Sequence, residues 1–168
     1  MRIPAKVDYA IRAMAELAAA GGGPVKAEEL AETQDLPLKY LLGILADLRR
    51  GHLVRGQRGP EGGFVLDRPA EEISLADIFR AVDGPLAEVR DQSLRALAYQ
   101  GASRELPRVW MAVRASLRRV LERVTIADLA ASSLPGAVED LAEEYLAATA
   151  AFRAGSAIRG GRGPEAGR

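Results

Sequence analysis

The fold of this chain is decided by residues 38–66, which read LKYLLGILADLRRGHLVRGQRGPEGGFVL. In the first part, leucines recur every three or four residues, the spacing of one face of an α-helix: Leu38, Leu41, Leu45 and Leu48. Gly51 then closes the predicted helix. Residues 53–58 are extended in character, residues 59–63 have the composition of a turn, and residues 64–66 resume a strand. Together they predict a β-hairpin.

Two more helices are predicted before this stretch. Apolar residues at helical spacing indicate an amphipathic helix over residues 4–20, and the glycine-rich residues 21–24 end it. A short helix begins at Ala27, and residues 34–37 form a tight connection to the next helix. Three helices followed by a hairpin is the order of elements in a winged helix. The expected fold class is therefore mainly α with a small β-hairpin wing, a winged helix-turn-helix.

The residues after the hairpin predict a long dimerisation helix and a C-terminal helix. Ser74 opens a helix through a capping box, and residues 86–102 show no clear periodicity. A long helix over residues 104–124 carries apolar side chains in alternating steps of four and three: Leu106, Trp110, Val113, Leu117, Val120 and Val124. This heptad stripe is either an internal core or a dimer interface. We favour the dimer interface, because the chain offers little else to cover the stripe and twofold assemblies are the commonest oligomers.

The predicted elements divide the chain into three parts. Residues 1–86 are expected to form the winged helix-turn-helix DNA-binding domain, and residues 87–154 a helical region for dimerisation and signal sensing. The last helix of that region follows Pro135. Residues 155–168 are rich in glycine and lack periodicity, so a disordered tail is expected there.

The composition excludes several classes of function. The chain has no cysteine and a single histidine, His52, which removes disulfides, thiol catalysis and cysteine-ligated iron–sulfur clusters. The sequence shows no carboxylate cluster, nucleophile–base pair or phosphate-binding loop, so we expect no metal, no cofactor and no enzyme. No apolar stretch has the length of a membrane span and the N-terminus lacks a signal-peptide pattern, so the expected location is cytoplasmic.

The distribution of charge is more informative than its total. The chain has 23 basic and 23 acidic residues, and this balance by itself argues mildly against a nucleic-acid partner. Residues 39–58, however, contain five basic residues and one acidic residue, a net charge of +4. A focused basic patch on a neutral protein is consistent with a sequence-specific regulator.

The third helix and the hairpin carry the residue types that a DNA contact requires. An α-helix fits the major groove, and a two-stranded wing can reach the adjacent minor groove. The small or apolar Leu42, Gly43 and Ala46 permit close approach to thymine methyl groups. Arg58 can enter an A·T-rich minor groove, where the potential is most negative. The candidate DNA-binding residues are Lys6, Tyr9, Lys39, Tyr40, Gly43, Arg49, Arg50, Arg58, Gly59, Gly62 and Gly63.

Three motifs in the chain are distinctive: RGPEGGFVL at residues 58–66, ISLADI at 73–78 and VDGPL at 82–86. Through them, residues 1–86 resemble the N-terminal domain of the Rrf-two family, which includes the iron–sulfur regulator IscR, the nitric-oxide sensor NsrR and the cysteine-metabolism repressor CymR. The resemblance implies a winged-helix dimer with crossed long helices. It also implies DNA contact from the helix that carries Lys39 and Tyr40, and insertion of Arg58 into the minor groove.

The chain departs from the family pattern at two places. Many members bind a cluster through three cysteines in the segment that matches residues 91–106, and this chain has none there. Asp8 matches a position that supplies a carboxylate ligand in some cluster-bearing members, but without thiolates we expect it to be a surface carboxylate. Leu42 and Gly43 stand where relatives often carry polar side chains that read bases, so the operator sequence does not carry over.

The sequence thus predicts a cluster-free regulator that binds a pseudo-palindromic operator in double-stranded DNA as a homodimer. We favour a repressor over an activator, because a dimer on promoter DNA blocks polymerase without any further contact. Its signal stays open between a small-molecule effector and a partner protein. Two alternatives also stay open. The winged helix could serve as a protein–protein interaction module that does not bind DNA, and Lys6 and Tyr9 could be ordinary surface residues.

Overall fold

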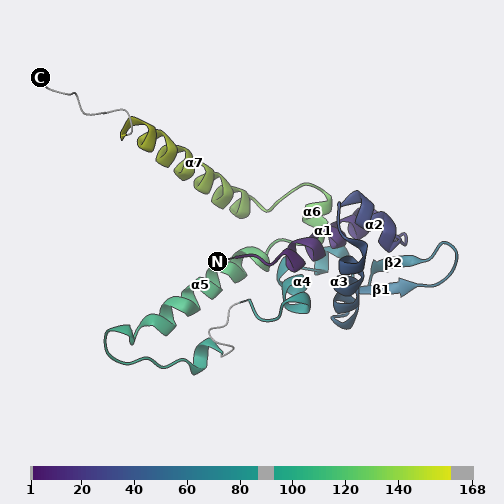
Figure 1. The fold of residues 1–168 in the computed structure, drawn as a ribbon, viewed down its shortest axis with the longest axis horizontal. Coiled ribbons are helices and arrows are strands. Elements are labelled where there is room, and N and C mark those ends of the chain that lie inside the picture. The colour runs from purple at the N-terminus through teal and green to yellow at the C-terminus, as the bar shows by residue number, and fades with distance from the viewer. Residues whose placement is uncertain (1, 87–92, 160–168) are drawn as a thin grey trace, which may run out of the picture. The chain divides into compact units, whose positions relative to one another are not determined.

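A winged helix-turn-helix occupies the N-terminal part of the chain (Figure 1). Three helices precede a two-stranded antiparallel hairpin: α1 (Ala5–Ala19), α2 (Ala27–Thr33), α3 (Leu38–Arg50), β1 (Val54–Gln57) and β2 (Gly63–Leu66). The predicted fold class, mainly α with a β-hairpin wing, is confirmed. The structure, a computed structural model, describes residues 2–86 and 93–159, with side chains described up to residue 150.

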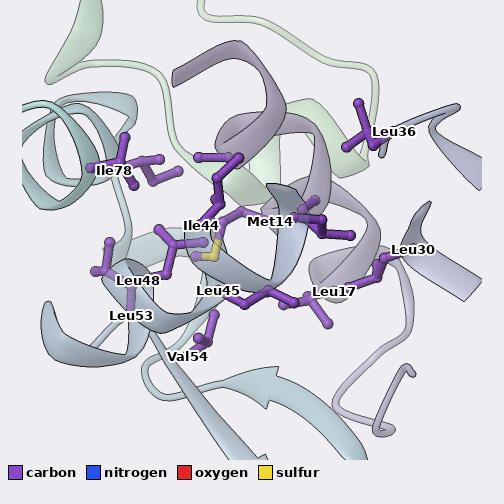
Figure 2. Close-up of a cluster of buried hydrophobic side chains, with 14 of the residues drawn as sticks. Met14, Leu17, Leu30, Leu36, Ile44, Leu45, Leu48, Leu53, Val54 and Ile78 are labelled. Atoms are coloured by element: carbon purple, nitrogen blue, oxygen red, sulfur yellow. The ribbon is translucent and has the colours of Figure 1, made fainter. Parts of the chain in front are cut away.

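The core is a cluster of apolar side chains from the helices of the winged helix, from the start of the hairpin and from helical elements that follow it, such as Ile78 (Figure 2). Leu41, Leu45 and Leu48 are fully buried, so the predicted leucine face of α3 is confirmed. Met14 of α1 belongs to the same cluster. Each such side chain stabilises the fold by about 1.5–3 kcal/mol through burial. The core therefore fixes α3 with its polar face toward solvent.

The chain leaves α3 through a left-handed residue at His52, where φ is 55°. The N–H of His52 donates to the Arg49 carbonyl (3.1 Å), and that of Leu53 donates to the Leu48 carbonyl (3.0 Å), as at many helix ends. Gly51 does not supply this conformation. Glycine is needed at position 51 for a different reason: a Cβ there would lie 2.9 Å from the Cβ of Ala81, in the helix that follows the wing.

The wing is joined at its base to Val25, in the loop between α1 and α2. The N–H of Val25 donates to the Phe64 carbonyl (3.0 Å), and the N–H of Phe64 donates to the Val25 carbonyl (2.8 Å). A Cβ on Gly63 would therefore lie 2.5 Å from the Val25 oxygen, and a Cβ on Gly62 would lie 2.3 Å from the Gln57 oxygen. These two glycines are required by the packing of the wing itself.

Gly63→Ala is expected to destabilise the protein by about 1–3 kcal/mol, because the new methyl group forces the wing away from Val25. Urea unfolding followed by circular dichroism measures the loss. Gly56→Ala is the matched control. Gly56 lies in the same hairpin, has no positive φ and would have no atom within 4 Å of its Cβ. Its substitution should change stability by less than about 0.5 kcal/mol. Equal effects of the two substitutions would contradict the packing argument.

A second group of helical elements follows the wing. A capping box begins the first α-helix of this group: the Ser74 hydroxyl accepts the N–H of Asp77 (3.2 Å), and the Asp77 carboxylate accepts the N–H of Ser74 (3.1 Å). This predicted box is confirmed. Thr125 and Asp128 repeat the arrangement later in the chain. The elements are η1 (Ala70–Glu72), α4 (Leu75–Val82), η2 (Leu94–Ala96), η3 (Gly101–Ser103), α5 (Leu106–Leu121) and α6 (Ile126–Ala130).

Helix α5 is shorter than the predicted helix over residues 104–124, since it ends at Leu121. The residues after it run beside the start of α4, where the N–H of Leu75 donates to the Val124 carbonyl (3.0 Å). Val124 is only 2% exposed. The assignment of Val124 to a dimer interface is therefore corrected, because its side chain is buried within its own protomer.

The chain divides into two compact units, Met1–Ser133 and Leu134–Arg168. The second contains α7 (Gly136–Arg159), which follows Pro135 as predicted. Residues 155–159 are helical, so the prediction of a disordered tail is wrong for them. Glycine at position 155 costs only about 1 kcal/mol relative to alanine and does not end the helix. The rest of the expected tail, residues 160–168, lies outside the described residues.

The functional division predicted between residues 86 and 87 stays a prediction. Within the part of the chain that the structure describes, no helix combines the length and the apolar character needed to cross a membrane.

Candidate nucleic-acid interface

The solvent-facing side of α3 carries cationic side chains and an apolar strip that protrudes little from the helix. Lys39, Arg49 and Arg50 are exposed. Leu42 is 46% exposed, and a Cβ on Gly43 would have no neighbour within 4 Å. Because the opposite face of α3 is fixed in the core, these groups project from a rigid helix whose surface is lowest at Gly43.

Most of the predicted α3 residues line one surface depression, which we call the α3 hollow. Its residues are Lys6, Lys39, Tyr40, Gly43, Ile44, Ala46, Asp47 and Arg50. The structure thus brings together five of the candidate DNA-binding residues, from α1 and α3. Arg49 lies outside the hollow. The candidates Arg58, Gly59, Gly62 and Gly63 lie in the wing and do not line this hollow.

Tyr40 is held in place by an aromatic contact with α1. Its ring lies edge-on to the ring of Tyr9, with centroids 5.8 Å apart and an interplanar angle of 86°. The Arg12 guanidinium lies 5.6 Å from the centroid of the Tyr9 ring, and its Nε donates to the side-chain oxygen of Gln34 (2.8 Å). Tyr9, a predicted phosphate contact, is therefore half-buried beneath Tyr40 and positions it. Arg12 was missed, although its place one turn after Tyr9 could have indicated this contact.

Lys6 connects three helices through its ammonium group. Its Nζ lies 2.5 Å from Oδ2 of Asp47 in α3 and donates to the Val82 carbonyl at the end of α4 (2.7 Å). Asp47 also pairs with Arg50. The hydrogen bond from Lys6, together with the charges of Lys6 and Arg50, holds the pKa of Asp47 below its usual value, against the opposing effect of partial burial. Lys6, a predicted phosphate contact, is thus neutralised by Asp47, the single acidic residue of the basic stretch.

Asp47→Asn is expected to lower stability at neutral pH by about 1–2 kcal/mol, because it removes a charged hydrogen bond between α1 and α3. A carboxylate with a lowered pKa stabilises the fold above its unfolded-state pKa, about 3.9, and loses this contribution as the pH falls through its folded-state pKa. The difference between wild type and variant should therefore shrink below about pH 4. Urea unfolding at several pH values measures it.

The control is Asp83→Asn, at an exposed aspartate that has no ion pair among the described residues. Its effect should stay within about 0.5 kcal/mol. A difference for Asp47→Asn that does not depend on pH would argue against the ion pair.

The tip of the wing presents Arg58 to solvent. Gly59 follows with a φ of 119°, a conformation that glycine adopts freely, and the N–H of Gly62 donates to the Gly59 carbonyl (2.9 Å) to close the turn. Arg55, lower on the hairpin, lies 3.8 Å from Asp67. Among the described residues, no carboxylate lies within 4 Å of Arg58. Its guanidinium is therefore available to an external anion.

A family model identifies the chain. The model of the Rrf2 family, described as "Iron-dependent Transcriptional regulator", matches residues 3–132. A Mycobacterium tuberculosis (strain H37Rv) protein with the name "Putative HTH-type transcriptional regulator Rv1287" is 51% identical over 148 residues, which cover 88% of this chain and 92% of that protein. The regulator CymR of Bacillus subtilis (strain 168) is 34% identical over 77% of this chain and 90% of its own length.

Solved structures show the same relationship. The structure of CymR, in its title the global cysteine regulator of B. subtilis, matches with a TM-score of 0.67 and 30% identity over 79% of this chain and 98% of that chain. The structure of T. potens IscR matches with a TM-score of 0.62 and 32% identity over 77% of this chain and 85% of that chain. These relatives are transcription regulators and not enzymes. The chain is a winged helix-turn-helix transcription regulator and belongs to the Rrf2 (Rrf-two) family.

Proposed function

We propose that this regulator is a cytoplasmic homodimer that represses transcription by binding a pseudo-palindromic operator, without an iron–sulfur cluster. The observation that carries the proposal is the face of α3, where exposed Lys39 and Arg50 flank the low surface at Gly43. This face fits the major groove, which admits an α-helix and offers both acceptor atoms and thymine methyl groups.

Each part of the interface has a distinct role in this proposal. Lys39, Arg49 and Arg50 contact phosphates or guanine edges, and Leu42 contacts thymine methyl groups. Tyr40 reaches the DNA backbone from its fixed position over α1. Arg58 enters the minor groove at the flank of each half-site. In this proposal, the protein recognises the shape and charge of DNA at the flanks of each half-site and thymine methyl groups at its centre.

The homodimer is supported by an apolar face of α5 that stays partly exposed in the described protomer. Trp110 is 36% exposed and Val113 is 41% exposed, although both are large apolar residues. A neighbouring face of the helix carries Met111 and Ala115, which line a depression together with Leu94 and Arg95 of η2. A second copy of α5 is the natural cover for the exposed stripe, because a twofold interface places the same residues against each other.

The cluster-free part of the proposal rests on the donor set of the chain. The family description names iron, but this chain has no cysteine and one histidine. In the described ranges, no three His, Asp or Glu side chains gather closely enough to hold a metal ion. Asp8 is 56% exposed and lies 3.5 Å from Arg12. These residues do not fit an iron–sulfur cluster, so sensing must depend on another signal.

Selection of bound sites from a random pool of double-stranded DNA tests the proposal. The full-length protein should enrich two inverted half-sites about one helical turn apart, and its affinity should fall steeply with salt concentration. Enrichment of a single half-site would contradict the dimer. No enrichment at low ionic strength would favour the alternative, a protein-interaction module that uses Leu42 as a contact.

A further inference from the structure

A second depression lies between η2 and α5, away from the DNA-binding face, and we call it the arginine hollow. Its volume is about 400 Å³, within the range of about 300–1,000 Å³ that is typical of small-molecule sites. Its lining residues are Leu94, Arg95, Met111, Arg114, Ala115 and Arg118. The site therefore combines an apolar part, including the buried side chain of Leu94, with three guanidinium groups.

Among the described residues, the cations of the arginine hollow outnumber their carboxylate partners. Nε of Arg118 donates to Glu122 (2.8 Å). Within the described part of the chain, Arg95 and Arg114 have no carboxylate within 4 Å. Three cations with one carboxylate partner among the described residues favour the entry of an anion. A guanidinium matches a carboxylate through two parallel hydrogen bonds.

The arginine hollow does not overlap the stripe that we assign to the dimer. As a set, Met111, Arg114 and Arg118 are centred about 100° around the helix from Trp110, Val113 and Leu117. Arg114, four residues after Trp110, lies at the border between the two faces. A second copy on the stripe therefore leaves the hollow on a neighbouring face.

We propose that the arginine hollow binds a small organic carboxylate with a short apolar chain, and that this ligand lowers the affinity for DNA. Arg95 and Arg114 bind the carboxylate, while Leu94, Met111 and Ala115 contact the apolar chain. The ligand class follows from the lining, because neither a purely apolar nor a purely ionic molecule would use both parts. The second half of the inference rests on the proposed DNA-binding function.

Ion pairs and one hydrogen bond, joined through α4, connect the hollow with the proposed DNA-binding face. Glu122, the partner of Arg118, also pairs with Arg80 of α4. The carbonyl of Val82, at the end of the same helix, accepts the hydrogen bond of Lys6, which pairs with Asp47 of α3. A ligand carboxylate held by Arg95 and Arg114 also attracts Arg118 and draws it away from Glu122. Arg80 is then the remaining ion-pair partner of Glu122 among the described residues, and the contact between α5 and α4 shifts. Helix α4 in turn holds α3 through Lys6.

The methionines provide a direct test of ligand binding. The chain has three methionines, of which Met14 lies in the core and Met111 in the arginine hollow. In full-length protein labelled with ¹³C-methyl methionine, hexanoate should shift the Met111 signal saturably and leave the Met14 signal unchanged. Hexylammonium, with the same chain and the opposite charge, should have no such effect.

Matched arginine variants locate the site. The double variant Arg95→Gln/Arg114→Gln should raise the Kd for hexanoate at least tenfold, while the unchanged Met14 signal shows that the core is intact. Arg119→Gln, on the same helix but outside the hollow, should change the Kd less than twofold. A smaller effect of the double variant, an equal response to hexylammonium, or no shift of Met111 overturns the inference.

The effect on DNA is measured separately, with the selected operator. Saturating hexanoate should weaken operator binding at least threefold, and saturating operator should raise the Kd for hexanoate by the same factor, because coupling between two sites is reciprocal. Binding of hexanoate without this coupling overturns the regulatory half. A protein that binds hexanoate and no DNA refutes the proposed function and leaves the ligand site standing.

Discussion

Val113→Asp is expected to convert the proposed dimer into folded monomers. Val113 is 41% exposed in the protomer, so the substitution leaves the fold of a single chain intact. In the proposed interface, the twofold axis brings the two new carboxylates near each other and away from water. An unpaired buried charge costs about 3–5 kcal/mol, which is enough to dissociate a dimer of moderate affinity. Sedimentation velocity measures the mass, and circular dichroism confirms the helix content.

Ala112→Asp is the matched control, because Ala112 is exposed on the same helix but lies outside the heptad stripe. This variant should remain dimeric. Val113→Asp should also bind the full operator no better than a single half-site. A stable Val113→Asp dimer would place the interface elsewhere. Leu117→Asp tests the same stripe less cleanly, because Leu117 is already half-buried in the protomer and its substitution also affects folding.

Arg58→Ala is expected to weaken operator binding by about 1–3 kcal/mol, five- to 150-fold in Kd. The guanidinium at the tip of the wing is exposed and is proposed to enter the minor groove, where its charge is attracted most strongly. Loss of this charge should also reduce the slope of log Kd against log salt concentration by about 1. Fluorescence anisotropy with the selected operator measures both quantities.

Two variants show whether the effect belongs to the wing. Arg58→Lys keeps the charge but lacks the planar guanidinium, so it should recover the salt slope and only part of the affinity. Arg119→Ala removes a charge from α5 and should leave operator binding within twofold of the wild type. All three proteins should remain dimers. If Arg58→Ala binds as tightly as the wild type, the wing has no part in DNA recognition.

The winged helix could be predicted from the sequence because its signals are local. The leucine spacing of α3 and the glycine-rich turn each determine one element without help from the rest of the chain. The end of α5 shows where a local signal fails. Val124 continues the heptad pattern, but the capping box at Thr125 requires extended backbone before α6, and the pairing of Val124 with Leu75 ends the helix earlier.

The contacts within the candidate site could not be predicted in the same way. Lys6 and Asp47 are far apart in sequence, and nothing local indicates that they form an ion pair. The same holds for Tyr9 beneath Tyr40. The requirement for glycine at position 63 depends on the approach of Val25, which only the folded chain shows. Residue types thus indicated the DNA-binding face, whereas the groups that position it became visible only in three dimensions.

The short antiparallel bridge between Ser74 and Thr125 has a consequence for the length of the DNA site. It joins the segment after α5 directly to the start of α4. Each winged helix is therefore connected firmly to the helix that we assign to the dimer interface. The two winged helices of a dimer would then keep a fixed separation and a fixed angle. One base pair inserted between the half-sites would both displace and rotate one half-site around the duplex. A rigid dimer could then no longer contact both half-sites.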